Sequence, residues 1–480
     1  MKLMTTTCIA TLGAIAAGPI WAEATDAGAA ELLSVFQTYL GTTEGVVSVA
    51  VAGDDYAVTL DPGAMMAALP LEGLAFTVSP IEMTLTDNGD GTWNYGIDQA
   101  ITMDYAMQGL MSAKTTYGSF IMNGVFDEAL GGSSEFSIEV TGISASQTQA
   151  DPNMGEVMIT TAVESYSMTG NAAAGAAGVD GGYTSLLSGM VYGIELPASE
   201  GVPVVQISVL IAQGTADFTL TGYQPKSLYS LLAWFVAHPN EAAIMSDKAG
   251  LKAQLAAAIP FFETASIAGA YTDISVDSPV GAFGLDEVAV ALDMNGIVTD
   301  GLFREAITLK GLSLPEGLVP PFAVPMIPEE VAIDVTASGF DLATTAQLAL
   351  GMLDLPEGSE RPEGFDMQML AALMPEGAVD IILAPGGVKN AAYNLTYVGA
   401  MRAGMDGMPT GTAKITFAGI DAIMAALQAA PPEMTGQVLP VLGMAQAMGQ
   451  PGAAGELVWD IDASAPGSLK VNGMDMMGGQ

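Results

Sequence analysis

The fold is decided by the run IEMTLTDNGDGTWNY, residues 81–95, in which two β-forming stretches flank a turn. The turn is residues 87–91, where Asn-Gly and Asp-Gly pairs accept the positive φ angles that a tight hairpin needs. Ile81, Met83 and Leu85 alternate with polar residues before it, which is the period of a strand with one buried face. The run predicts an antiparallel β-hairpin.

The same alternation extends along the chain on both sides of this hairpin. Residues 46–51 lead through a Gly-Asp-Asp turn at 53–55 into residues 56–60, which predicts a second hairpin. Further predicted strands are 119–126, 136–144, 157–168, 215–221, 265–276, 285–294, 297–312, 331–337, 379–383, 390–398 and 412–417. In the first half, strands follow one another without helices between them, which favours antiparallel pairing over parallel β-α-β units.

Helical patterns are predicted mainly in the second half. The predicted helices are 227–237, 241–259, 341–353, 365–374, 420–429 and 435–448. The first is apolar on nearly every side, which indicates burial. The fold class is therefore α+β and β-rich, with long antiparallel sheet and helices concentrated in the second half.

The chain begins with the pattern of a secretory signal peptide. A Lys at position 2, a short apolar run and small residues up to Ala22 have the order of an export signal that is cleaved. We expect residues 1–22 to be the signal and 23–480 to form one extended β-rich domain in the periplasm, whose two halves could meet near the small-residue patch at 171–182. The one cysteine, Cys8, falls within the signal, so the mature protein would have no disulfide.

Charge and hydropathy exclude two kinds of partner. Twelve Lys and Arg stand against 53 Asp and Glu, a net charge of −41, which repels nucleic acid and disfavours anionic lipid surfaces. Half of the residues are hydrophobic, but polar residues interrupt them before about 20 accumulate, the length that a spanning helix needs. We expect no transmembrane segment after processing.

Three short runs in the second half of the chain resemble a known family. The runs DSPVGAFGL (277–285), IVTDG (297–301) and LKGLSLPEGLVP (309–320), together with the signal and the length, resemble the DUF 2125 family of exported Gram-negative proteins, whose function is unknown. Residues 467–473, GSLKVNG, are similar to the closing strand of large periplasmic β-groove proteins. These motifs are turns and strands, so the resemblance implies a fold and a location and assigns no catalytic residue.

The residues that usually carry catalysis are scarce. There is one histidine, His238, beside a proline at a predicted helix break, and no Gly-x-Ser-x-Gly or Ser-x-x-Lys motif occurs in the chain. Asp460 and Asp462 share a strand face, yet among so many acids such a pair is weak support for a glycosidase. We therefore predict that the protein is not an enzyme.

Two metal interpretations are weaker than structural ones. Residues 87–98 have glycines at positions 3 and 5 of a calcium-binding EF-hand loop, where oxygen ligands are needed, and Asp98 in place of the final Glu, so the hairpin turn explains them better. Met401, Met405 and Met408 could bind Cu(I) through their thioethers, but methionine also fills cores and lines adaptable apolar grooves. We predict no metal site and no cofactor.

Two functions remain for an exported, non-catalytic protein. The first is binding or sheltering an apolar, lipid-like ligand, and the alternative is a structural or assembly factor of the cell envelope that acts through protein contacts. The stretch after residue 227 is more apolar than one packed helix face requires. Its largest side chains are either ligand-lining or core residues, and they are Trp234, Phe235, Met245, Phe261 and Phe262.

Overall fold

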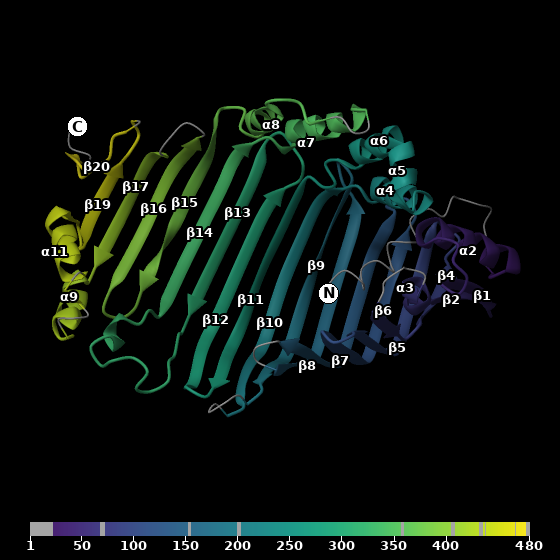
Figure 1. The fold of residues 1–480 in the computed structure, drawn as a ribbon, viewed down its shortest axis with the longest axis horizontal. Helices are drawn as coiled ribbons and strands as arrows, with labels where there is room; N and C mark the ends of the chain where they lie inside the picture. Colours follow the sequence, from purple (N-terminus) through teal and green to yellow (C-terminus); the bar gives the residue numbers. More distant parts are fainter. Residues whose placement is uncertain are drawn as a thin grey trace. The chain divides into compact units, whose positions relative to one another are not determined.

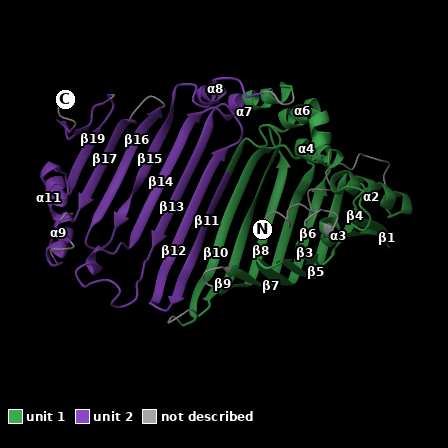
Figure 2. Cartoon of the chain, in the orientation of Figure 1, with its two compact units in different colours: residues 1–265, 347–359 green, residues 266–346, 360–480 purple. Residues whose placement is uncertain are grey.

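The computed structural model describes residues 23–67, 73–151, 155–198, 203–356, 360–404, 409–431, 435–436, 438–465 and 467–476. The predicted signal peptide, residues 1–22, lies outside this range, as do Met405 and Met408. The chain divides into two compact units, shown in Figure 2. Unit 1 contains residues 1–265 and 347–359, and unit 2 contains residues 266–346 and 360–480.

Unit 1 is an antiparallel sheet with helices at one end (Figure 1). Its strands are β1 (Val47–Ala52), β2 (Asp55–Leu60), β3 (Leu74–Val78), β4 (Ile81–Asp87), β5 (Thr92–Met107), β6 (Met111–Asp127), β7 (Gly132–Asp151), β8 (Gly155–Ala174), β9 (Val179–Leu196) and β10 (Val205–Tyr223). Its helices are α2 (Asp26–Leu40), α3 (Pro62–Ala67), α4 (Pro225–Ala237), α5 (Glu241–Ser246) and α6 (Lys248–Ala258).

The strands of unit 1 pair mostly with their neighbours in sequence. β5 to β10 form a meander, and β4 and β3 pair with successive parts of the free edge of β5. Both predicted hairpins are confirmed: Val47 pairs with Leu60, and Asp87 pairs with Trp93. The turn between the second pair uses Gly89 and Gly91 at φ 75° and 84°, as the Asn-Gly and Asp-Gly signals predicted.

Unit 2 repeats the meander. β11 (Thr264–Ser278) begins at the end of unit 1, and the described strands of unit 2 continue with β12 (Gly281–Asn295), β13 (Gly301–Lys310), β14 (Glu330–Phe340), β15 (Ala378–Lys389), β16 (Asn394–Gly404), β17 (Thr410–Ala418), β18 (Gln450–Pro451), β19 (Leu457–Asp462), β20 (Lys470–Val471) and β21 (Met474–Asp475). β12 to β17 pair in order, and β19 follows β17.

Helical segments lie between the strands of the second half of the chain. They are η2 (Val324–Met326), α7 (Leu342–Gly351), η3 (Met352–Asp354), α8 (Phe365–Leu373), α9 (Ile420–Gln428) and α11 (Val438–Met448). α9 and α11 contact each other, and the Trp459 indole of β19 donates to the carbonyl of Ala445 in α11 at 2.9 Å. α7 begins in unit 2 and ends in unit 1.

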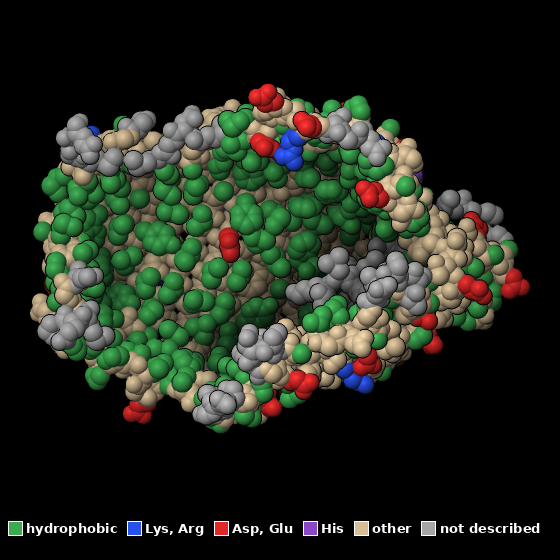
Figure 3. Space-filling model, in the orientation of Figure 1, with side chains coloured by type: hydrophobic (Ala, Val, Ile, Leu, Met, Phe, Trp, Pro, Cys, Tyr) green, Lys and Arg blue, Asp and Glu red, His purple; other side chains and the backbone are tan. Residues whose placement is uncertain are grey.

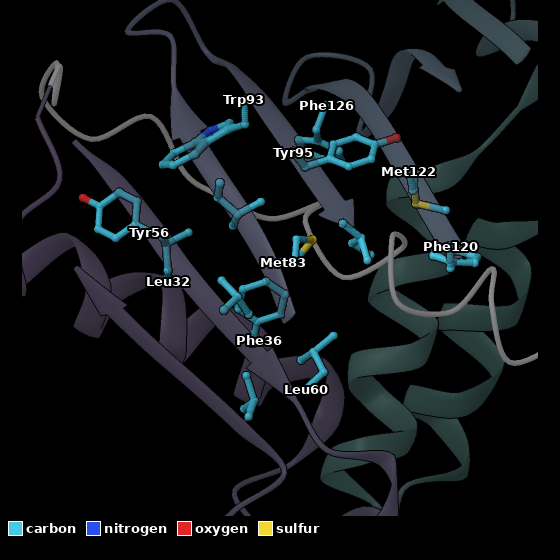
Figure 4. Close-up of a cluster of buried hydrophobic side chains, with 14 of the residues drawn as sticks. Leu32, Phe36, Tyr56, Leu60, Met83, Trp93, Tyr95, Phe120, Met122 and Phe126 are labelled. Carbon is cyan, nitrogen blue, oxygen red and sulfur yellow. The ribbon is translucent and has the colours of Figure 1, made fainter. Parts of the chain in front are cut away.

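The main buried core lies in unit 1 between α2 and the first strands (Figure 4). Phe36 of α2, Leu85 of β4 and Phe126 of β6 are fully enclosed. α2 forms here because Thr25 caps its first turn through the N–H of Gly28 and its apolar residues fall on one side. Tyr95 lies over Gly124, its cross-strand partner, where an added Cβ would come within 2.5 Å of the ring.

The structure adds elements that the sequence did not predict, among them α2, β3 and β9. α2 adds a helix near the start of the chain, so the helices are not confined to the second half. β9 was not predicted, and residues 171–182 lie in the β8–β9 hairpin, where Asn171 pairs with Gly182. The division between the compact units falls at residue 265. The β-rich class with long antiparallel sheet is as expected.

Candidate ligand-binding face

The sheet of unit 2 has one apolar face and one charged face. Partners directly across an antiparallel pair lie on the same face, so the register sorts the residues. Ile307 of β13 pairs with Val290 of β12 and with Ile333 of β14, which puts these three on one side. The same procedure assigns the rest of what we call the apolar face of unit 2: Val288, Leu292, Met294, Phe303, Leu309, Val331, Val335, Val379, Ile381, Leu383, Val388, Leu395, Tyr397, Met401, Ile415, Phe417, Leu457, Trp459 and Ile461.

The apolar face of unit 2 is open to solvent over β12 to β14, whereas at β19 Trp459 is buried beside α11. Val290, Phe303 and Ile333 are 38%, 40% and 47% exposed, and within the described part of β12 to β17 no hydrophobic side chain belongs to the buried core. Figure 3 shows a wide field of hydrophobic side chains over these strands. Monomeric soluble proteins seldom expose contiguous apolar patches above a few hundred Å², and larger ones mark binding surfaces.

The opposite surface, which we call the charged face of unit 2, carries ion pairs between strands. Arg304 of β13 holds Asp293 of β12 at 2.7 Å and Asp334 of β14 at 2.8 Å. Beside it, Lys310 binds Glu287 at 2.7 Å. The list continues with Lys389–Glu330, Arg402–Asp380 and Lys414–Asp460. Hydrogen bonds from Ser266 and then Arg304 keep the pKa of Asp293 below its usual value.

The two faces are chemically separate because the charges follow the strand period. Every Lys and Arg on β13, β15, β16, β17 and β20 is paired by register with charged-face residues, as Lys470 is with Asp462. The alternation that makes each strand two-sided therefore places the ion pairs on one side and most of the hydrocarbon on the other. No cation of these described strands is left on the apolar side.

Unit 1 has an apolar face of the same kind. From the core, Ile143 of β7 leads by register to Val163, Met190 and Ile211 on β8, β9 and β10. Tyr192 pairs with Val209, and Ile194 with Ile207, on that side. The other side of these strands mixes Ser, Thr and Gln with exposed hydrophobic residues, among them Met158, Val191 and Leu210. Among described residues, the hydrophobic side chains of β9 and β10 are outside the buried core, so α2 covers only the start of this face.

The structure places Trp234 in a packed helical cluster. Its ring stacks on His238 at 4.0 Å, and its indole N–H donates to Oδ2 of Asp247 at 3.1 Å. Asp247 also caps α6 through the N–H of Gly250. The indole bond first, then the backbone N–H and the His238 charge, lower the pKa of Asp247. His238 Nδ1 lies 2.7 Å from the Trp234 carbonyl, so this group holds helix ends together.

The other predicted lining residues are less enclosed. Phe235 and Met245 are 41% and 37% exposed on α4 and α5. Phe261 and Phe262 are partly buried where the chain passes from α6 to β11, and Phe261 adopts φ 66° while its carbonyl accepts from Gln224. Phe235 packs edge-on against Trp234 at 5.3 Å. These side chains belong to unit 1, whereas the larger apolar faces come from strands that the sequence reasoning did not select.

Polar sites in the described part of the chain are few. A shallow pocket of about 300 Å³ on β3, β5, β6 and β7 includes Phe76, Tyr105 and Lys114. Lys114 is 3.8 Å from Asp104 and both are well exposed, so solvent screens the pair. No cluster of three or more His, Cys, Asp or Glu that could hold a metal occurs among the described residues. Nor does any described helix combine the length and the apolar character needed to cross a bilayer.

Comparison with known proteins gives little information about the family or function of this chain. No family model matches the chain, and no curated relative matches it. Among solved structures, the crystal structure of the siderophore receptor PirA from Acinetobacter baumannii aligns at a TM-score of 0.18 and 9% identity. The alignment covers 76% of this chain and 62% of the receptor chain, so it spans less than two thirds of the receptor's length. At this level the likeness carries no argument about fold or function.

Proposed function

We propose that this is an exported, non-catalytic protein of the Gram-negative periplasm that shelters a lipid-like ligand on the apolar faces of its sheets. The observation that carries the proposal is the apolar face of unit 2, where Val290, Phe303 and Ile333 remain exposed. Covering hydrocarbon of this kind gains about 25 cal/mol per Å² removed from water. A hydrocarbon chain could cover it without needing polar partners.

The strand chemistry supports a ligand over an internal function for this face. A sheet in a globular protein normally buries one face against another layer. Here the charged face already carries the ion pairs of Arg304 and Lys310, so it is the solvated side of the sheet. The apolar side is then the side that lacks its second layer among the described residues.

The charge of the chain disfavours coverage by a second copy. At −41, two copies repel each other over the Debye length, which is about 8 Å at physiological salt. An uncharged hydrocarbon chain experiences no such repulsion. An envelope protein that docks on the same face is the alternative, and the export signal at residues 1–22 fits either partner.

The test is native mass spectrometry with lipid extraction on mature protein purified from the periplasm of a Gram-negative host. We expect a stoichiometric mass increment that organic extraction recovers as lipid. A bare protein mass, together with no binding of monomyristoylglycerol to the purified protein, would overturn the proposal. Co-purification of a protein in place of lipid would support the alternative.

A further inference from the structure

Glu305 of β13 is a charged residue within the apolar face of unit 2, away from its edge, where Asp286 precedes Val288 on the same side of β12. Its cross-strand partners are Leu292 of β12 and Val335 of β14, and on its own strand it lies between Phe303 and Ile307 on that face. The Glu305 side chain is exposed. The carboxylate is therefore surrounded by hydrocarbon on all four sides within the sheet.

Glu305 lacks the kind of partner that the acids of β12 and β14 have on the charged face. On the charged face, Asp293 and Asp334 share Arg304. No hydrogen bond or ion pair joins the Glu305 side chain to another residue in the part of the chain that the structure describes. Water solvates it while the face is open. A ligand that covered the face would displace that water, and a desolvated carboxylate needs a cation or a donor in exchange.

The charges of the sheet decide which ligand can make that exchange. An anionic head group would find no Lys or Arg on the apolar face and would be repelled by Glu305. A neutral chain would leave the carboxylate without a partner. An ammonium group would neutralise it by a charge-assisted hydrogen bond or a close ion pair. The apolar face would hold the hydrocarbon tail of the same molecule.

We infer that Glu305 binds the ammonium group of an amphiphile whose hydrocarbon chain lies on the apolar face of unit 2. This inference rests on the proposed function and adds a head-group preference to it. The preference has a local part, at Glu305, and a general part, because a chain at −41 attracts any cation. The experiment must separate the two.

A matched pair of variants does this. Glu305→Gln removes the carboxylate from the apolar face, and Glu287→Gln removes the same charge from the charged face, one strand away on β12. Both variants change the net charge equally. The probes are tetradecyltrimethylammonium, monomyristoylglycerol and myristate, each below its micelle concentration, because they carry similar chains with cationic, neutral and anionic heads. Binding to delipidated mature protein is measured by displacement of an apolar fluorescent dye.

For the unaltered protein we expect the ammonium probe to bind most tightly and myristate least. Glu305→Gln should weaken binding of the ammonium probe about fivefold, the size of a partly solvated ion pair, and should not weaken binding of the neutral probe. Glu287→Gln should change neither by more than about twofold. Equal losses in both variants, or no loss in Glu305→Gln, would overturn the inference and leave the proposed function standing. If none of the probes binds the unaltered protein, the proposed function itself fails and the inference falls with it.

Discussion

Ile333 of β14 and Ile382 of β15 are equally exposed, at 47% and 46%, yet they lie on opposite faces of the unit 2 sheet. Ile333 pairs with Ile307 on the apolar face. Ile382 pairs with Thr336, which pairs in turn with Arg304 on the charged face. Substitutions of these two equally exposed isoleucines, on adjacent strands, therefore test the two faces separately.

This pair gives the sharpest test of the apolar face. Ile333→Asn should weaken binding of monomyristoylglycerol about tenfold, because an isoleucine contributes about 1.5 kcal/mol when it is covered. Ile382→Asn should leave binding unchanged. Both substitutions place the same residue at a half-exposed strand position, so their effects on stability should be alike. The measurement is the dissociation constant from dye displacement.

One result would contradict ligand binding at the apolar face of unit 2. If Ile382→Asn weakens binding as much as Ile333→Asn does, the ligand does not distinguish the faces, and a general loss of structure explains both. Denaturant unfolding of each variant, followed through the fluorescence of Trp459 in β19, checks that unit 2 is intact.

Arg304 should contribute more to unit 2 than any single ion pair of its sheet. Its guanidinium donates from Nε and a terminal nitrogen to Asp334 at 3.0 and 2.8 Å, and from the other terminal nitrogen to Asp293 at 2.7 Å. Arg304→Met would leave two neighbouring acids without a cation. We expect unit 2 to lose about 1 kcal/mol of unfolding free energy, at the upper end for exposed pairs with favourable geometry. Urea unfolding measures the loss.

Lys414→Met is the control for this prediction. Lys414 makes one longer contact, 3.4 Å to Asp460, and both side chains are more than half exposed. We expect its replacement to change the unfolding free energy by less than about 0.5 kcal/mol. A loss as large as that of Arg304→Met would show that net charge, and not the bridging geometry, determines stability here.

Much of the strand pattern could be predicted because alternation and turn chemistry are local signals. The Asn-Gly and Asp-Gly turn fixed the β4–β5 hairpin, and the alternation in β13, β14 and β16 marked two-sided strands. The sequence did not predict β9, because glycines such as Gly181 and Gly182 and the small residues at 171–178 are typical of a loop. In the structure β9 forms because it pairs along its length with the long strands β8 and β10, although its glycines have a low strand propensity.

The candidate site could not be predicted because it depends on which faces stay uncovered. Trp234 and Phe235 were selected for their local apolar density, and the structure packs Trp234 against His238 inside a helical cluster. Ile333 and Glu305 belong to ordinary alternating strands. Only the register between strands shows that they share a face, and only the missing layer shows that this face is open.

Phe36 and Phe235 should differ widely in their contribution to unit 1. Phe36 is completely buried between α2 and the first strands, as Figure 4 shows, whereas Phe235 is 41% exposed. We expect Phe36→Ala to cost about 3 to 5 kcal/mol and Phe235→Ala about 1 kcal/mol, chiefly its contact with Trp234. Denaturant unfolding measures both. Equal costs would mean that Phe235 is buried in solution by a partner or by a second copy.

Tyr229 should make unit 1 sensitive to alkali. Its side chain is 9% exposed on α4, against Tyr39 of α2 at a ring distance of 6.0 Å. Burial first, then the phenols of Tyr223 and Tyr39, raise the pKa of Tyr229 well above its ordinary value of 10.

The folded state holds the Tyr229 proton more tightly than the unfolded state. The contribution of this phenol to the stability of unit 1 is therefore fully present below pH 10. It is lost as the pH rises through the range between the unfolded and folded pKa values. At pH 11 the buried phenol should cost unit 1 about 1.4 kcal/mol that Tyr229→Phe does not lose, while the two proteins differ little at pH 7. Urea unfolding at both pH values, followed by Trp234 fluorescence, measures the difference. Identical pH profiles would show that the phenol reaches water in the folded protein and that α2 and α4 do not pack as described.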